Sequence, residues 1–419
     1  MKSGAALVRR FLGALAEGSA DAPGVTRDAY GPGEQMAHDL ARREALALGC
    51  EVRTDAAGNL MMTLAGPDRD APCLLVGSHL DSVPHGGNYD GAAGVAAGLA
   101  LIADLVGAGI QPAQDLVVVA FRAEEAAWFP VSYPGSEAML GTLDPALLEV
   151  LHLRTGLTLA HHMGAAGFDP DAVRRGERQF DPTRIGAFVE VHIEQGPVLI
   201  GEGVPVGLVT AIAGGFRHTQ ARAVGAWAHS GATPRAYRQD AVLAVADMAA
   251  GLDAAWDAIE AAGRSATITI GVVATDPALH GGSRVAGEVA VCIDIRSEFG
   301  DVLDGVRREL LTLTAGIAER RGVAVDLGPE FTWEIAQMDA GLLTALEASA
   351  AAAGVATMRL PSGAGHDAAV LASAGVPTAM LFVRNAHGSH NPDEAMDPAD
   401  LDQAVAVLMA YVMGSGGLA

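Results

Sequence analysis

The chain has 419 residues, of which 50% are hydrophobic and only 18% are charged. That composition supplies enough apolar material for a core and excludes a disordered chain or a highly charged coiled coil. The 27 basic and 50 acidic residues give a formal net charge of −23. A nucleic acid is therefore not an expected partner, because phosphate backbones need a dense basic face. At roughly 100–200 residues per domain, the length predicts two or three domains.

Membrane and export signals are not evident in the sequence. Arg9 and Arg10 interrupt the only early apolar stretch, and no run approaches the ~18 apolar residues that a membrane helix needs. The cysteines Cys50, Cys73 and Cys292 form no C-x-x-C pair, and their odd number fits buried thiols better than a disulfide framework. We therefore expect a soluble cytoplasmic protein with no membrane partner.

Short apolar runs alternate with helical segments in the first half of the chain and return near its end. The runs cover residues 73–77, 116–121, 187–193 and 378–383, and an alanine-rich helix is expected over 91–106. Buried β-branched runs separated by helices are typical of parallel sheets with helices on both faces. The sequence therefore predicts an α/β fold with a mixed, mostly parallel sheet flanked by helices.

The middle of the chain has a different order of elements. The expected elements are a strand at 216–224, a helix at about 239–262, strands at 266–273 and 288–296, a helix at 301–321 and a strand at 323–327. That order is βαββαβ, the split unit of a small two-layer α+β domain. Because the outer pattern then resumes, we expect residues 213–330 to be a domain inserted into a larger one formed by 1–212 and 331–419.

Candidate metal ligands follow the predicted strands. His79 and Asp81 end the first strand in G-S-H-L-D, where the histidine can ligate a metal while the aspartate accepts its other ring proton, unless the pair is a surface turn. Asp90 precedes the alanine-rich helix and can either cap that helix or bridge two ions. Glu124 and Glu125 follow the second strand, either as a metal ligand beside a general base or as a solvated acidic turn.

Two histidines complete the candidate set. His192 lies near the end of the third strand, and His390 lies in a polar loop after the fourth. Taken alone, the first is typical of a core histidine and the second of an ordinary loop residue. Because ligands gather outside the carboxyl ends of strands in open α/β sheets, all candidates are expected to meet at one edge. Two histidines, a bridging aspartate and a glutamate suit zinc, cobalt, nickel or manganese rather than calcium.

Seven sequence strings lie along the chain in a fixed order. They are G-S-H-L-D-S-V-P at 77–84, G-G-N-Y-D-G at 86–91, E-E at 124–125, H-I-E-Q-G-P at 192–197, A-H-S-G-A-T-P at 228–234, L-P-S-G-A-G-H-D-A at 360–368 and S-H-N-P-D-E at 389–394. In these strings the chain resembles the M20-type metallohydrolases. The resemblance is to the amidase branch, which includes N-carbamoyl-L-amino-acid hydrolases, allantoate amidohydrolases and β-ureidopropionases. H-I-E-Q-G-P and S-G-A-G-H-D-A are typical of this branch rather than of the family's peptidases.

The resemblance implies a metal site with two divalent ions per subunit, Zn²⁺ or alternatively Mn²⁺, Co²⁺ or Ni²⁺. The positions that match the family's metal ligands are His79, Asp90, Glu125, His192 and His390. Asp90 would bridge the ions. Asp81 matches the partner of the first histidine, and Glu124 matches the general base. Residues 1–212 and 331–419 correspond to the catalytic domain.

Substrate-binding roles are implied for four further positions. Gln195 matches a substrate-contacting glutamine. His229 matches a catalytic histidine that contacts substrate and stabilises the oxyanion in the site of the partner subunit. Arg296 matches the arginine that grips the substrate carboxylate, a task that suits a bidentate guanidinium. Ser283 stands where relatives often carry a substrate-contacting asparagine, and its side chain is shorter and has less reach. The inserted domain corresponds to a lid and dimerisation domain.

The resemblance thus implies a homodimeric enzyme that cleaves the carbamoyl C–N bond of N-carbamoyl-L-amino acids to amino acid, carbon dioxide and ammonia. Its small-molecule substrate would carry a carboxylate and a carbamoyl or ureido group. Allantoate amidohydrolase is the alternative, and an aminoacylase or metallopeptidase is a wider one. Trp128 and Phe129 either line a pocket for an apolar side chain, which would favour an amino-acid substrate, or belong to the core. A non-catalytic binder would be expected to lack the base or a ligand, and all are present.

Overall fold

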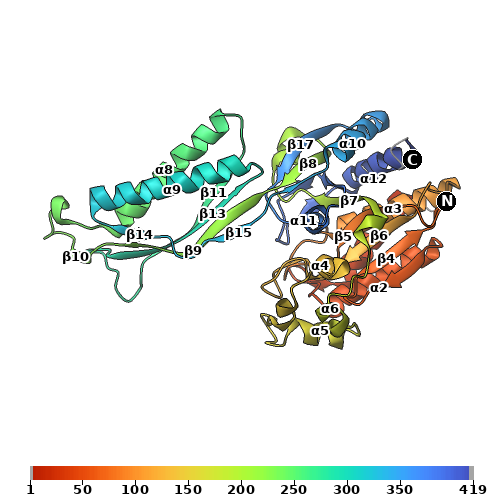
Figure 1. The fold of residues 1–419 in the computed structure, drawn as a ribbon, viewed down its shortest axis with the longest axis horizontal. Helices are drawn as coiled ribbons and strands as arrows, with labels where there is room; N and C mark the ends of the chain where they lie inside the picture. The colour runs from red at the N-terminus through yellow and green to blue at the C-terminus, as the bar shows by residue number, and fades with distance from the viewer. Residues whose placement is uncertain (1–2, 415–419) are drawn as a thin grey trace. The chain divides into compact units, whose positions relative to one another are not determined.

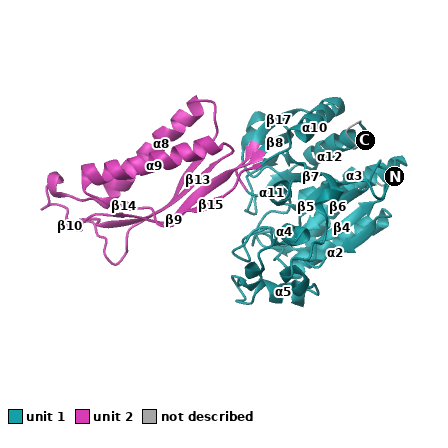
Figure 2. Cartoon of the chain, in the orientation of Figure 1, with its two compact units in different colours: residues 1–210, 337–360, 365–419 teal, residues 211–336, 361–364 magenta. Residues whose placement is uncertain are grey.

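The computed structural model describes residues 3–414, so both extreme ends of the expected larger domain lie outside the described residues. Within this range the chain separates into two compact units (Figure 2). Unit 1 contains the described residues up to 210, residues 337–360 and those from 365 onward. Unit 2 contains residues 211–336 and 361–364.

In the described part of the chain, unit 1 is built on a nine-stranded mixed sheet with the order β16-β8-β18-β7-β5-β6-β4-β3, and β17 also pairs with β8 (Figure 1). The strands are β3 (Glu51–Thr54), β4 (Leu60–Leu64), β5 (Cys73–His79), β6 (Leu116–Phe121), β7 (Ile185–Ile193), β8 (Val206–Ile212), β16 (Ala336–Gln337), β17 (Thr357–Ser362) and β18 (Thr378–Val383). The central strands β18, β7, β5 and β6 pair in parallel, whereas β8, β4 and β3 join by antiparallel pairing. The predicted α/β fold class is confirmed, and its parallel pairings lie at the centre.

The helices of unit 1 flank this sheet. They are α1 (Gly4–Gly18), α2 (Pro32–Ala47), α3 (Ala92–Ala108), α4 (Pro134–Leu140), α5 (Leu159–Ala165), α6 (Pro170–Arg174), α7 (Val198–Glu202), α10 (Ala340–Ala353), α11 (Asp367–Ser373) and α12 (Pro398–Met413). The short elements are β1 (Ala20–Asp21), β2 (Gly24–Val25), β19 (Asn385–Ala386), β20 (Ala395–Met396) and 3₁₀ turns at Pro145–Glu149 and Pro182–Arg184. Among the described residues, none of the helices has both the length and the apolar character needed to cross a membrane.

The centre of unit 1 is apolar on both faces of the sheet. Strands β5 and β6 are buried along their whole length, which explains why their sequences are continuous apolar runs rather than alternating ones. Helix α3 packs across β5, β6 and β7 with small residues. At Gly94, an added Cβ would lie 2.1 Å from the carbonyl oxygen of Val191, so glycine allows the helix to approach the sheet this closely. The start of α3 is thereby fixed beside the strand ends.

Unit 2 contains, within residues 211–336, a five-stranded antiparallel sheet with the order β11-β13-β9-β14, and β15 also pairs with β9. Its elements are β9 (Gly214–Val224), β10 (Ala228–His229), a 3₁₀ turn at Arg235–Tyr237, α8 (Ala241–Ala261), β11 (Thr267–Ala274), β12 (Arg284–Val285), β13 (Glu288–Ser297), α9 (Gly300–Arg321), β14 (Ala324–Asp326) and β15 (Phe331–Trp333). Figure 1 shows α8 and α9 side by side along one face of the sheet. The main elements follow the predicted βαββαβ order, which is confirmed.

The patterns of unit 2 explain its two layers. Strand β13 buries every second side chain, and α8 buries residues three or four positions apart. These apolar faces meet in one core around Phe216. The opposite face of the sheet carries Arg217, Asp294 and Arg296 beside a hollow lined by threonines.

Candidate metal centre

The carboxyl ends of the parallel strands bring the predicted ligands to one edge of the unit 1 sheet. His79 is the last residue of β5, and His192 is the last but one of β7. Glu125 follows β6, Asp90 lies two residues before α3, and His390 lies in the loop after β19. This is the edge of an open α/β sheet where ligands bind.

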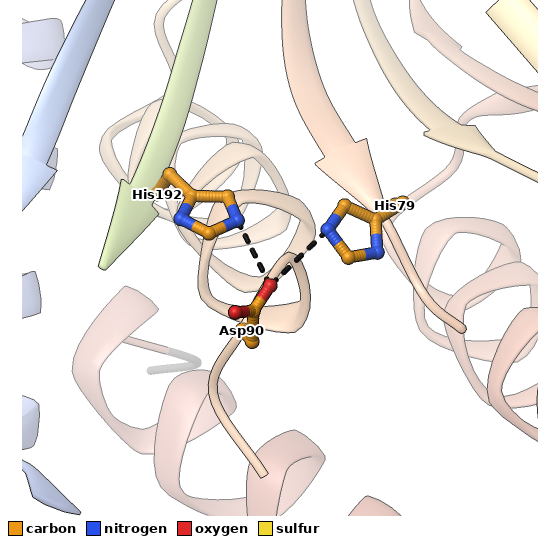
Figure 3. Close-up of side chains that lie close together, drawn as sticks. All are labelled: His79, Asp90 and His192. Carbon is orange, nitrogen blue, oxygen red and sulfur yellow. Dashed lines mark ion pairs between the residues drawn. The ribbon is translucent and has the colours of Figure 1, made fainter. Parts of the chain in front are cut away.

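His79, Asp90 and His192 form what we call the buried group, because each is almost fully buried. The Nε2 atoms of both histidines face Oδ1 of Asp90, at 3.3 Å for His79 and 3.0 Å for His192 (Figure 3). Nδ1 of His79 lies 3.2 Å from both the carbonyl oxygen and Oδ1 of Asp81, and Nδ1 of His192 lies 2.9 Å from the carbonyl oxygen of Ile193. Such anchors fix the ring orientation and direct Nε2 toward a metal.

The alternative in which Asp90 caps the following helix is wrong. The N-cap of α3 is Gly91, with φ of 64°, and no side chain caps that helix. An added Cβ at Gly91 would lie 2.5 Å from the ring of His79. Glycine therefore provides both the left-handed backbone and the space that the histidine occupies, and the carboxylate of Asp90 remains directed at the two rings.

Asp90, Glu125 and His390 form a second cluster that we call the half-exposed group. Nε2 of His390 lies 3.2 Å from Oε1 of Glu125 and 3.6 Å from Oδ2 of Asp90. The His390 side chain is 50% exposed. Oε1 of Glu125 is buried and its contact with His390 does not meet hydrogen-bond geometry, which fits a position where a cation would bind. In each group, the candidate ligand atoms lie within 4.8 Å of one another.

Glu124 lies at the edge of the buried group. Its Oε2 is 3.8 Å from Nε2 of His79, and the residue is 8% exposed. The backbone N–H groups of Glu124 and Glu125 donate to the two carboxylate oxygens of Asp81, each at 3.1 Å. Asp81 thus orients both a candidate ligand histidine and the turn that carries the glutamate pair.

Electrostatics separate the roles of the carboxylates in the metal-free protein. Burial raises the pKa of Glu124 well above its usual value, and the nearby charge of Glu125 adds to this against the opposing effect of His79. Burial would also raise the pKa of Asp90, but His192 and His79 hold it well below its usual value. A carboxyl with a raised pKa is suited to accept and return a proton, whereas a persistently charged one is suited to hold cations.

Gln195 lies within the same cluster. Its Nε2 donates to Oδ2 of Asp90 at 2.9 Å and lies 3.5 Å from Nε2 of His390. The predicted substrate-contacting side chain is therefore placed beside both ligand groups, in contact with the carboxylate that they share. Its contact with a substrate stays a prediction.

Three other predicted substrate-binding residues belong to unit 2. His229 is exposed, and its Nδ1 accepts the backbone N–H groups of Gly231 and Ala232 at 3.2 Å each, which leaves Nε2 as a donor. The carbonyl oxygen of Ser283 accepts the N–H of Ser230 at 2.9 Å, so Ser283 lies beside the same short strand pair.

Arg296 lies at the other end of the unit 2 sheet. It pairs with Gly215 at the start of β9, whereas β10 follows the far end of β9 (Figure 1). Nine residues of β9 separate the two ends, about 30 Å of extended chain. Nε of Arg296 donates to Oδ1 of Asp294 at 2.7 Å, and Nη1 donates to the carbonyl oxygen of Gly363 at 2.6 Å. Within unit 2, Arg296 is therefore not brought together with His229.

Sequence reasoning missed a buried ion pair behind the glutamate turn. Oε2 of Glu34 lies 2.9 Å from Nη1 of Arg122, and its Oε1 accepts the N–H of Ala123 at 2.9 Å. Ala123 has φ of 55°, so this contact holds a left-handed residue immediately before Glu124. Glu34 lies 89 positions from Ala123, and no local motif points to the contact.

Trp128 and Phe129 belong to the core rather than to a substrate pocket. They are 2% and 1% exposed, and both lie in an apolar cluster with Leu148 and Met163. The indole Nε1 of Trp128 donates to the carbonyl oxygen of Ser82 at 2.8 Å. Of the two alternatives for this pair, the core position is therefore confirmed, and the pocket for an apolar substrate side chain is wrong.

The fold and this site define a metallohydrolase of the M20 family, to which the chain belongs. Residues 75–414 match the sequence profile of Peptidase family M20/M25/M40. The chain is 36% identical over 402 residues to an N-carbamoyl-L-amino acid amidohydrolase of Geobacillus stearothermophilus, covering 94% of each chain. It is 31% identical over 397 residues to an allantoate amidohydrolase of Bacillus subtilis, covering 94% of this chain and 92% of the relative.

A solved structure places the chain in a particular branch of that family. A hydantoinase/carbamoylase family amidase from Burkholderia ambifaria superposes with a TM-score of 0.85 at 33% identity, covering 98% of this chain and 95% of that one. The predicted membership in the amidase branch of the M20 family is confirmed.

Proposed function

We propose that this protein hydrolyses the carbamoyl C–N bond of an N-carbamoyl-L-amino acid. One molecule of water is consumed, and the free amino acid, carbon dioxide and ammonia are released. The observation that carries the proposal is the position of Asp90, whose Oδ1 faces His79 and His192 and whose Oδ2 faces His390. The 36% identity to an N-carbamoyl-L-amino acid amidohydrolase supports the choice of substrate.

The donor set fits two divalent transition-metal ions, and we propose Zn²⁺, Mn²⁺, Co²⁺ or Ni²⁺ for the two groups. His79 and His192 would hold one ion, Glu125 and His390 would hold the other, and Asp90 would bridge them. Ions bound there supply Lewis-acid polarisation of the scissile carbonyl group. Oε1 of Glu125, which is buried and makes no hydrogen bond, is consistent with this assignment.

Glu124 would act as the general base and then as the general acid. It would take a proton from the attacking water and return it to the leaving nitrogen. Its raised pKa supports proton retention between these two steps. Asp81 would keep Glu124 in place through the backbone N–H group of that residue.

Substrate orientation would come from Gln195 and Arg296. Arg296 presents its guanidinium on the open face of the unit 2 sheet, and a substrate carboxylate would replace the carbonyl oxygen of Gly363 as its partner. His229, with Ser283 beside it, is separated from Arg296 by the length of β9. A single small substrate cannot reach both, and this supports a homodimer in which His229 serves the site of the partner subunit. Unit 2 would then be the lid and dimerisation domain.

Allantoate is the second candidate substrate. The burial of Trp128 and Phe129 removes the reason to favour an apolar substrate side chain. Ser283, in place of the usual asparagine, leaves the lid contact open to either substrate. The 31% identity to an allantoate amidohydrolase keeps this alternative in the test.

The test is ammonia release by purified Mn²⁺- or Co²⁺-loaded protein on parallel panels of N-carbamoyl-L-amino acids and allantoate, with an EDTA-stripped control. We expect turnover of carbamoyl substrates that disappears with EDTA. Turnover of allantoate alone would replace the substrate assignment, and activity that survives metal removal would contradict the class of mechanism.

We propose that the enzyme is cytoplasmic because its free Cys50 and Cys73 suit a reducing compartment, and cell fractionation tests that assignment.

A further inference from the structure

One buried carboxylate joins the loops that carry Asp90 and His390. Glu394 is 7% exposed and ends the S-H-N-P-D-E string. Its Oε1 accepts the backbone N–H of Tyr89 at 2.7 Å and that of Asp90 at 3.2 Å. Its Oε2 accepts the hydroxyl of Ser389 at 2.8 Å, and the same hydroxyl contacts Oδ2 of Asp90. The loop after β19 therefore holds Asp90 by both its backbone and its carboxylate.

The packing around Glu394 is close and specific. An added Cβ at Gly87 would lie 2.2 Å from Cδ of Glu394, so the glycine makes room for this carboxylate. The neighbouring Asn88 accepts two hydrogen bonds from the fully buried Arg27, one to its Oδ1 at 3.1 Å and one to its carbonyl oxygen at 3.4 Å. The loop that presents Asp90 is thus held by a cation through Asn88 and by the carboxylate of Glu394.

The histidines of the two groups are supported differently. His79 and His192 are fixed by the strands on which they lie. His390 lies in an irregular loop with φ of 60°, and its side chain is half exposed. Among the described residues, Glu394 and Ser389 link the loop of His390 directly to Asp90, the ligand that both groups share.

We propose that Glu394, acting with Ser389, is a positioning residue that enables the half-exposed group to retain its metal ion. Glu394 fixes the spacing between Asp90 and the loop of His390 and does not itself ligate an ion. This inference rests on the proposed function, because it requires metal ions in both groups. It adds a residue outside the ligand set on which the second ion depends.

The variants separate this role from general stability. Glu394→Ala removes every contact, whereas Glu394→Gln keeps an oxygen for the two backbone N–H groups and offers an N–H to Ser389. Ser389→Ala removes only the hydroxyl link. Asp169→Ala is the matched control, because Asp169 also accepts two backbone N–H groups, those of Asp171 and Ala172 at 3.0 Å each, at the start of α6.

The measurement is calorimetric titration of metal-stripped full-length protein with Mn²⁺, together with the absorption spectrum of the Co²⁺-loaded protein and its thermal unfolding. We expect Glu394→Ala to lower the affinity of the half-exposed group for its ion, called the second ion, by about 10–100-fold, the range typical of residues that support metal ligands. The affinity of the buried group for its ion, the first ion, should change little. Ser389→Ala should weaken the same ion less. Glu394→Gln and Asp169→Ala should titrate like the wild type.

The outcomes separate this inference from the proposed function. Wild-type protein that binds fewer than two ions contradicts the proposed dinuclear site. If the wild-type protein binds two ions and the Glu394→Ala variant binds both as tightly as the wild type does, only the positioning role is overturned. If Glu394→Ala does not fold, Ser389→Ala decides the matter, because an unchanged second ion in that variant also overturns the inference.

Discussion

The two candidate ligand groups share Asp90 but are built from different parts of the fold. The buried group takes His79 and His192 from adjacent parallel strands, whose hydrogen-bonded ladder fixes the distance between them. The half-exposed group takes Glu125 and His390 from two loops, and nothing periodic fixes their spacing. The comparison shows that one edge of a sheet can define half of a site, while single side-chain contacts must define the other half.

This difference predicts unequal metal binding. Strand positions in a buried core open only with much of the fold, whereas a half-exposed loop opens at lower free energy. We therefore expect the ion of the buried group to bind more tightly and to exchange more slowly than the ion of the half-exposed group.

The largest effect is expected for Asp90→Ala, which removes the element that the two groups share. Both ions should be lost or greatly weakened, and the loss of several kcal/mol of transition-state stabilisation should lower kcat/KM by about 10³-fold or more. Metal content and ammonia release measure this result. The exposed Asp393 in the His390 loop provides the control, since Asp393→Ala should retain both ions. Two tightly bound ions in Asp90→Ala would contradict the shared role.

His192→Ala and His390→Ala separate the two groups. His192→Ala should lower the affinity for the tightly bound ion, and His390→Ala should lower only the affinity for the weaker ion. Each affinity should fall by more than the 10–100-fold typical of residues that support a ligand without binding the metal. The Co²⁺ spectrum and the stoichiometry should therefore differ between the two variants. Identical titrations would mean that the sites are not distinct in the way that the strand and loop positions indicate.

The sequence was sufficient to predict the central strands, because those strands are buried on both faces and are largely apolar. It did not predict β3, β4, β8 or β17. Strand β3 contains Glu51 and Arg53 and alternates between exposed and half-buried positions, so its sequence does not resemble that of a buried strand. Such strands are defined by pairing with a neighbour, as β3 is with β4, and local sequence does not contain that information.

Site prediction followed the same division. Most candidate ligands were proposed because they lie near the end of a predicted strand or at the start of a helix, whereas His390 lies in a loop and was proposed with the help of the S-H-N-P-D-E string. Glu394 and Arg122 could not be assigned, because their partners Asp90 and Glu34 lie 304 and 88 positions away. The burial of Trp128 was also not decided by sequence, since an aromatic residue after a strand is equally compatible with a pocket and with a core.

A smaller effect is expected for Asp81→Asn, which alters the anchor of the buried group without removing a ligand. The amide nitrogen of the new side chain would face one of the two backbone N–H groups that Asp81 now accepts. Affinity for the tighter ion should fall by about 10–100-fold, and kcat should fall more than KM rises because Glu124 is displaced. Mn²⁺ titration and steady-state kinetics measure these effects. A variant with an altered KM and an unchanged kcat would place Asp81 outside the chemistry.

The smallest effect is the proton that His390 releases when the half-exposed group binds its ion. The close contact with the carboxylate of Glu125 raises the pKa of His390 to about 9 in the metal-free protein, despite partial burial. The folded-state pKa of His390 lies above its unfolded value. The stabilisation that the contact with Glu125 gives the metal-free fold is therefore fully present below about pH 6.5, and it is lost as the pH rises through about 9. A metal ion binds only the neutral imidazole, so loading at pH 7.5 should displace about one proton from His390. Calorimetry in buffers of different ionisation enthalpy should find about one proton fewer in His390→Ala, and an equal count would mean that this histidine is already neutral before the ion binds.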